Sequence, residues 1–190
     1  MTKMNNNPTS PSPSFDYKGW RENFITTLLR IICVLGVPFI AVSFPTATNA
    51  DRVLFISSYV LLLAVTLAPV RYKVRAFALL LLTYVIGVNS VLAWGPWLDG
   101  SIFFIAFVTM SALLFDERLD IIALVLGIFT YTVIALLQQY KIHEFWGTDV
   151  PATTPLDWIA YTANFSIISA ILMVAINQIK REFARVVENM

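Results

Sequence analysis

The chain has 190 residues, of which 58% are hydrophobic and 13% charged, and its mean hydropathy is +0.73. This composition is too apolar for a soluble domain of this size and indicates an integral membrane protein. A formal net charge of +1 gives no reason to expect nucleic-acid binding. One cysteine, Cys33, and one histidine, His143, cannot build a disulfide framework or a zinc site, so we expect no metal and no cofactor.

The N-terminal stretch MTKMNNNPTSPSPS is rich in proline, serine and asparagine and has no apolar run. Such a segment cannot bury enough surface to offset its chain entropy. Residues 1–18 are therefore predicted to be a disordered cytoplasmic tail. The absence of a closely following apolar region and of a small-residue cleavage site argues against a signal peptide.

Six later segments are long and apolar enough for helices that cross a bilayer, which takes about 20 residues each. We expect the fold to be all-α, with residues 19–179 forming a bundle of six transmembrane helices and residues 180–190 a cytoplasmic helical extension. The predicted spans are residues 24–44, 53–70, 76–94, 96–115, 121–139 and 158–179.

Lysine and arginine orient this bundle, because they are retained on the cytoplasmic side during insertion. Only Arg52 and Lys141 fall on the side opposite to the two termini. Both termini are therefore predicted to be cytoplasmic, in a bacterial inner membrane. On the cytoplasmic side the pattern places Lys3, Lys18, Arg21, Arg30, Arg71, Lys73, Arg75, Arg118, Lys180, Arg181 and Arg185.

Polar residues inside the predicted spans are few. Asn89, Ser90 and Asn164 lie at similar depth in outer halves of helices, where they either bond helices together or line a small polar pocket. Pro38 lies within the first span and frees the carbonyl of Val34, which gives either a tolerated kink or a hinge. Arg30 is interpreted mainly as a side chain that reaches the inner headgroups.

No catalytic motif accompanies these residues, so the chain is not expected to be an enzyme. His143 lies in a predicted outer loop. We expect it to be an interfacial loop residue and not a phosphoacceptor. The nearly complete lack of charge within the spans also argues against a proton or ion pump.

The last helix is predicted to continue into the cytoplasm without a glycine or proline break. Its apolar residues alternate at spacings of three and four, which is typical of a coiled-coil seam. An amphipathic helix on the inner leaflet explains the same run. The predicted seam consists of Ile176, Ile179, Phe183, Val186 and Met190.

Residues 21–190 resemble the N-terminal membrane module of multi-pass bacterial sensor histidine kinases and related PAS-linked signalling proteins. The resemblance rests on VRAFALLLLTYVIGV after a basic turn, on GPWLDGSIFFIAFVTMSALLFDERLDIIALVLGIFTYTVIALL, and on LDWIAYTANF at the final span. It implies that the last helix continues as a signalling helix. A kinase would require further sequence beyond residue 190.

The leading hypothesis is a sensory or regulatory module that passes a bundle rearrangement to its output helix. Its expected partners are the lipid bilayer and either a second copy or a larger membrane complex. One alternative is a non-catalytic accessory subunit of such a complex. The other is a transporter of a small neutral solute, which would use Asn89 or Asn164.

Overall fold

The computed structural model describes residues 17–45, 47–97, 99–115, 117–142 and 152–188. Within these ranges the chain forms helices and no strand, which confirms the all-α class. One helix lies at each predicted span. The helices are α1 (Tyr17–Ser43), α2 (Asn49–Leu67), α3 (Tyr72–Trp94), α4 (Asp99–Leu114), α5 (Glu117–Gln139) and α6 (Pro155–Glu188).

Four of these helices are long and apolar enough to cross a membrane. The qualifying stretches are Gly19–Ser43, Tyr72–Trp94, Arg118–Gln139 and Pro155–Phe183, and α4 contributes the shorter apolar stretch Gly100–Leu114. A helix pairs every interior backbone group within its own segment, so it is the structure that a lipid environment favours for such sequences.

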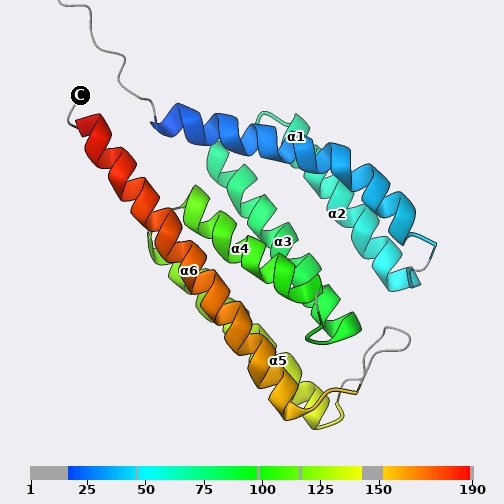
Figure 1. Ribbon diagram of the computed structural model, residues 1–190. Coiled ribbons are helices and arrows are strands. Elements are labelled where there is room, and N and C mark those ends of the chain that lie inside the picture. The colour runs from blue at the N-terminus through cyan, green and yellow to red at the C-terminus, as the bar shows by residue number, and fades with distance from the viewer. Residues whose placement is uncertain (1–16, 46, 98, 116, 143–151, 189–190) are drawn as a thin grey trace, which may run out of the picture.

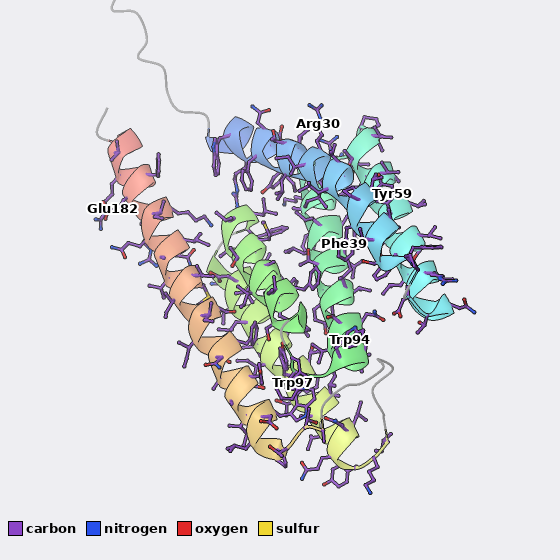
Figure 2. The ribbon with its side chains drawn as sticks, turned by 45° about the vertical axis from the view of Figure 1, so that its right-hand side comes forward. Arg30, Phe39, Tyr59, Trp94, Trp97 and Glu182 are labelled. Atoms are coloured by element: carbon purple, nitrogen blue, oxygen red, sulfur yellow. The ribbon has the colours of Figure 1, made fainter. Side chains whose placement is uncertain are left out.

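Helix α4 lies at the centre of the fold and contacts α3, α5 and α6, whereas α1 and α2 pack on each other and on α3. Figure 1 shows that the start of α1 and the end of α6 lie at the same end of the bundle. In Figure 2, Arg30 and Glu182 lie toward this end, and Trp94 and Trp97 lie toward the opposite one. Arg30 thus lies toward the end of the bundle that the distribution of Lys and Arg assigned to the cytoplasm.

At two places a helix falls three residues short of the predicted span, and local chemistry explains both. Helix α2 stops at Leu67 rather than at residue 70, because Pro69 follows and the preceding Ala68 is extended (φ −72°, ψ 145°). Helix α4 begins at Asp99 rather than at Pro96, because α3 ends at Trp94 and the next residue, Gly95, has a positive φ of 75° at which the chain turns.

Helix α1 continues through Pro38 to Ser43. The hydroxyl of Tyr59 on α2 donates to the backbone carbonyl of Cys33, 3.2 Å away, one residue before the carbonyl that Pro38 leaves without its partner. Gly36 allows this approach, because a Cβ there would lie 3.1 Å from Cε2 of Tyr59. The proline-containing part of α1 is therefore held by a neighbouring helix.

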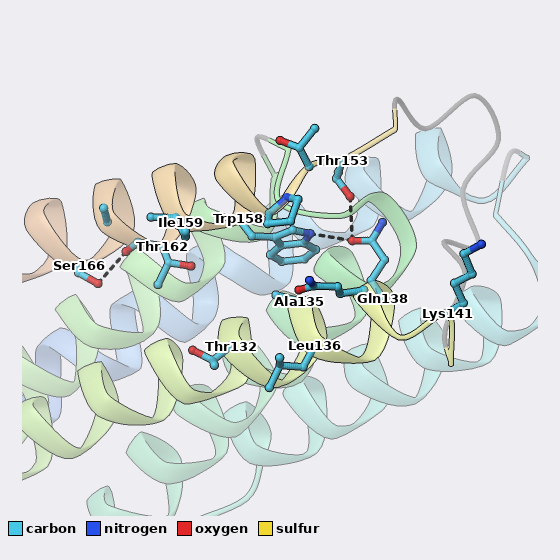
Figure 3. Close-up of a pocket in the computed structure, with 14 residues that line it drawn as sticks. Thr132, Ala135, Leu136, Gln138, Lys141, Thr153, Trp158, Ile159, Thr162 and Ser166 are labelled. Atoms are coloured by element: carbon cyan, nitrogen blue, oxygen red, sulfur yellow. Dashed lines mark hydrogen bonds between the residues drawn. The ribbon is translucent and has the colours of Figure 1, made fainter.

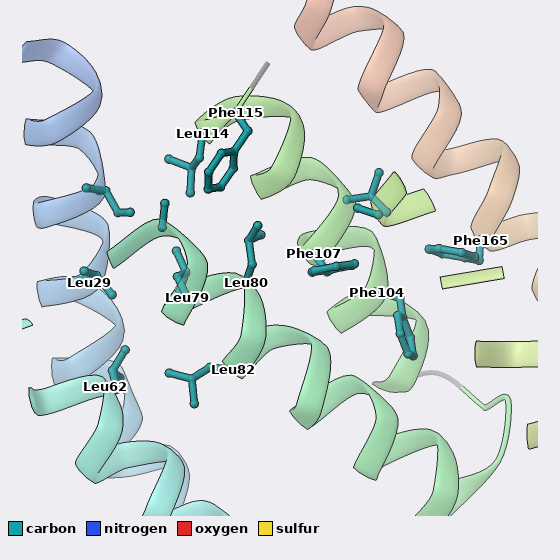
Figure 4. Packing of buried hydrophobic residues seen from close by; sticks show 14 of the residues in the cluster. Leu29, Leu62, Leu79, Leu80, Leu82, Phe104, Phe107, Leu114, Phe115 and Phe165 are labelled. Atoms are coloured by element: carbon teal, nitrogen blue, oxygen red, sulfur yellow. The ribbon is translucent and has the colours of Figure 1, made fainter. Parts of the chain in front are cut away.

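The buried core between α4, α5 and α6 is aromatic. Phe104, Tyr131 and Phe165 pack with ring centroids 5.2 to 6.0 Å apart, and Figure 4 shows Phe104 and Phe165 among the buried side chains. Helix α5 carries Gly127 against this cluster, and a Cβ at that position would lie 2.6 Å from Cζ of Phe165. Because lipid is as apolar as these side chains, close packing rather than exclusion of water stabilises the contact.

Candidate functional site

Several polar contacts of the bundle lie at the end where α1 begins and α6 ends, around the last turn of α4. The backbone carbonyl of Leu114 accepts a hydrogen bond from the guanidinium of Arg21 on α1 and another, 2.7 Å long, from the hydroxyl of Tyr72 on α3. The carbonyl groups that end a helix have no partner within it and carry partial negative charge. Side chains of α1 and α3 therefore supply the donors that the end of α4 needs.

Helix α6 supplies the third donor to the same turn. Nζ of Lys180 donates to the carbonyls of Ala112 at 2.6 Å and Phe115 at 2.7 Å. A lysine ammonium beside a helix C-terminus is favourable both as a hydrogen-bond donor and as a charge. The sequence analysis placed Lys180 at the start of the predicted cytoplasmic extension, and the structure directs its ammonium group to the end of α4.

One turn before Lys180, Asn177 ties α6 to α5. Its Nδ2 donates to Oδ2 of Asp120, 2.7 Å away. The side chain of Asp120 is fully buried, at 0% exposure, and its other oxygen accepts from the backbone N–H of Ile121. The predicted spans left Asp120 in the connection between residues 96–115 and 121–139, but α5 already begins at Glu117, so Asp120 lies inside the helix and against α6.

These contacts fix the position of α6 relative to the rest of the bundle. Asn177 and Lys180 are three residues apart and therefore share one face of the helix. One bonds to α5 and the other to the end of α4, which is also held by α1 and α3. We call Arg21, Tyr72, Asp120, Asn177 and Lys180, with the carbonyls they contact, the inner polar junction. A shift of α6 along or about its axis would break the bonds of Asn177 and Lys180 together.

A second polar contact lies at the opposite end of the bundle, where α3 meets α2. Nδ2 of Asn89 donates to Oδ1 of Asp51, 3.1 Å away. Asp51 also belongs to a capping box with Thr48, whose backbone N–H and hydroxyl both donate to it. Burial acts to raise the pKa of Asp51, but the hydrogen bonds from Thr48 and Asn89 outweigh it, and the pKa lies below its usual value.

This pKa predicts a pH-dependent effect of Asn89→Leu. A carboxyl group with a lowered pKa in the folded state stabilises the fold above its unfolded pKa, and the stabilisation is lost as the pH falls through the folded value. We expect Asn89→Leu to lower the midpoint of thermal unfolding in detergent at pH 7, and the difference from the unsubstituted protein to shrink below about pH 4. A difference that stays constant from pH 7 to pH 3 would exclude an ionised Asp51 as the partner.

The structure places the other predicted residues separately. It pairs Asn89 with Asp51 rather than with Asn164, which is exposed on α6, and Ser90 is half-buried on α3. Ile176 is half-buried, and Met190 and His143 lie outside the described residues. The exposed members of the seam are Ile179 at 57%, Phe183 at 57% and Val186 at 56% of their side-chain surface.

Within the described ranges, no group of three or more His, Cys, Asp or Glu side chains is arranged to hold a metal ion. Cys33 is buried on α1, with its sulfur 3.4 Å from the hydroxyl of Thr66. The inner polar junction thus consists of hydrogen bonds between helices and helix ends, and such a set of contacts can hold or release a helix position.

The apolar helices, their polar junctions and the single long α6 define an all-helical membrane domain. The sequence model of the MASE11 family matches residues 19–181, and the chain belongs to this family. MASE11 is a membrane-associated sensor-type domain family. No curated protein and no solved structure matches the chain.

Proposed function

We propose that the chain is the sensory module of a bacterial signal-transduction protein, in which a rearrangement of the helical bundle moves a cytoplasmic output helix. In this proposal all six helices cross the inner membrane and both termini are cytoplasmic. The family membership supports a sensor, and the count of Lys and Arg on each side supports the orientation. The chain itself carries out no catalysis.

The observation that carries the proposal is the continuity of α6. This helix runs without a break from Pro155 to Glu188, a length of about 51 Å at 1.5 Å per residue. About 30 Å suffices to cross the hydrocarbon core. The remaining turns extend past the inner polar junction, so a displacement at the outer end of α6 is transmitted along one rigid element.

A sensor also requires an alternative arrangement of its helices that is close in free energy to the first. The inner polar junction meets this requirement. A signal needs two packings that differ by a few kcal/mol and a stimulus that favours one of them. Breaking the bonds of Asn177 and Lys180 costs a similar amount, since single hydrogen bonds contribute about 1 kcal/mol and those to charged groups about 1.5–3 kcal/mol. The junction is therefore strong enough to define one state and weak enough to be released.

We further propose that two copies meet along the exposed seam of α6. Ile179, Phe183 and Val186 follow the three-four spacing of a coiled coil, and all three are more than half exposed. They lie beyond Asn177, on the part of α6 that leaves the bundle. Two seams in contact would bury these side chains and connect the modules of a dimer.

Cysteine crosslinking tests this arrangement. In a Cys33→Ser background, Ile179→Cys is expected to crosslink between copies in membranes, and Phe183→Glu with Val186→Glu is expected to abolish the crosslink, because like charges would face each other in the seam. Arg181→Cys, on the opposite face of the helix, serves as the matched control and is expected to crosslink weakly. Unchanged crosslinking at position 179 in the double glutamate variant would exclude the coiled coil.

The link to a kinase or PAS partner has its own test. The gene sequence that follows the codon for Met190 is expected to continue into a signalling domain, or a gene encoding one is expected beside it. A neighbouring operon that encodes only subunits of a different membrane complex would favour the accessory-subunit reading instead.

A further inference from the structure

A groove of about 680 Å³ lies between the end of α5 and the start of α6. Figure 3 shows the side chains that line it, from Thr153 and Gln138 at its mouth to Thr162 and Ser166 along α6. The groove thus lies at the end of the bundle opposite to the inner polar junction, on the helix that continues into the cytoplasm. Neither the family match nor the predicted site residues assign it a role.

Gln138 has a fixed orientation at the mouth of this groove. Its Oε1 accepts from Nε1 of Trp158 at 2.7 Å and from the hydroxyl of Thr153 at 2.8 Å. An indole nitrogen can only donate, so the atom that faces it must be the amide oxygen. The amide NH₂ is therefore the group left over, and within the described part of the chain it has no acceptor.

A basic side chain also lines the groove. Lys141 is exposed and takes a positive φ of 56° two residues after the end of α5. An ammonium group and an amide NH₂ offer only donors. The mouth of the groove is therefore suited to a group that accepts hydrogen bonds and carries negative charge.

The part of the groove that lies away from Gln138 has a different character. The hydroxyls of Thr132 and Ser166 donate to carbonyls of their own helices, at 2.9 and 2.7 Å, and the apolar side chains of Leu136 and Ile159 lie beside them. From Pro155 to Ser166 the groove follows α6 for about 16 Å, roughly half of a hydrocarbon core. It offers a polar end and an apolar end, which is the shape of an amphiphile site.

We propose that this groove binds an amphiphile with an anionic head, carboxylate or phosphate, and an acyl chain. The head would accept hydrogen bonds from the Gln138 amide beside Lys141, and the chain would lie between Leu136 and Ile159. A role of this ligand as the stimulus of a sensor rests on the proposed function, because the ligand would act by separating or clamping the outer ends of α5 and α6. The binding itself does not depend on signalling and is tested separately.

The probe is dodecyl phosphate brominated on the chain carbons next to its head, because bromine quenches tryptophan fluorescence at short range and Trp158 lies at the Gln138 end of the groove. The full chain is placed in phosphatidylcholine nanodiscs and titrated with this probe. We expect saturable quenching that inorganic phosphate does not compete with, since it has no chain. A brominated dodecyltrimethylammonium probe, with the opposite head charge, is expected to bind at least about tenfold more weakly.

Gln138→Glu is the decisive variant, because it keeps an oxygen for Trp158 and Thr153 and replaces the NH₂ by a second oxygen. We expect its affinity for dodecyl phosphate to fall at least about tenfold. Gln178→Glu makes the same chemical change at an exposed site on the cytoplasmic part of α6 and is expected to change nothing. Lys141→Gln, which leaves the bonds of Gln138 intact, is expected to weaken binding about threefold.

The outcomes separate the sources of the ligand and the two proposals. If phosphatidylglycerol in the nanodisc competes with the probe, the natural occupant is a bilayer lipid, and if it does not, the occupant is a single-chain amphiphile. Equal affinity of Gln138→Glu and the unsubstituted protein, or equal binding of the cationic probe, would overturn the groove as a site. Loss of seam crosslinking with unchanged quenching would overturn the proposed output through α6. The groove would still stand as a binding site.

Discussion

Replacing Asn177 by leucine is expected to lower the free energy of unfolding by about 2–3 kcal/mol. The substitution removes the donor to Oδ2 of Asp120, whose side chain is fully buried and keeps only the backbone N–H of Ile121. A buried polar group that loses its partner costs more than the hydrogen bond contributed, because water cannot replace the bond. Unfolding by dodecyl sulfate in mixed micelles, followed by circular dichroism, measures the change.

Two control variants accompany Asn177→Leu, one at the neighbouring Gln178 and one that removes both members of the Asp120–Asn177 pair. Gln178→Leu makes a nearly identical change at an exposed position next in the chain and is expected to cost less than about 0.5 kcal/mol. Asp120→Leu combined with Asn177→Leu removes both polar groups and is expected to recover most of the loss. If Asn177→Leu and Gln178→Leu were equally mild, Asp120 would not depend on α6 for its partner.

The fold follows from the sequence because a membrane leaves few choices. An apolar segment of sufficient length has to pair its backbone internally, so each such segment predicts one helix. The helix boundaries were less predictable, because apolar residues continue past the point where a helix ends. Val70 is apolar and was included in a span, but Pro69 ends α2 at Leu67.

The polar junctions could not be predicted from the sequence for a different reason. Asn177 and Asp120 are 57 residues apart, and Asn89 and Asp51 are 38 residues apart, so each pair depends on how the helices are placed side by side. A hydropathy scale places Asp120 just outside its span and thereby treats it as solvated. Only the contact with α6 makes it a buried group.

Helix α6 shows how far a local sequence pattern can predict contacts. Its three-four spacing predicted that Ile179, Phe183 and Val186 share a face, and all three are exposed. The same spacing puts Asn177 and Lys180 together on another face. The contacts of that face depend on where the end of α4 lies. The sequence of α6 alone does not predict this position.

Replacing Lys180 by methionine tests whether that face holds the output helix. Methionine is also unbranched and is only one atom shorter, but it has no donor for the carbonyls of Ala112 and Phe115. We expect a loss of about 2–3 kcal/mol in the free energy of unfolding, from the charged hydrogen bonds and the helix dipole together. We also expect a changed rate of crosslinking at Ile179→Cys, because α6 is released from α4.

Lys73→Met removes an equal charge from an exposed position that the charge pattern places on the same side of the membrane, and it is expected to alter neither quantity. Lys180→Arg retains the charge and is expected to restore most of the stability. If Lys180→Met destabilised the protein without any change in crosslinking, the inner polar junction would have only a structural role. A change in both quantities would mean that the end of α4, held jointly by α1, α3 and α6, sets the position from which the output helix moves.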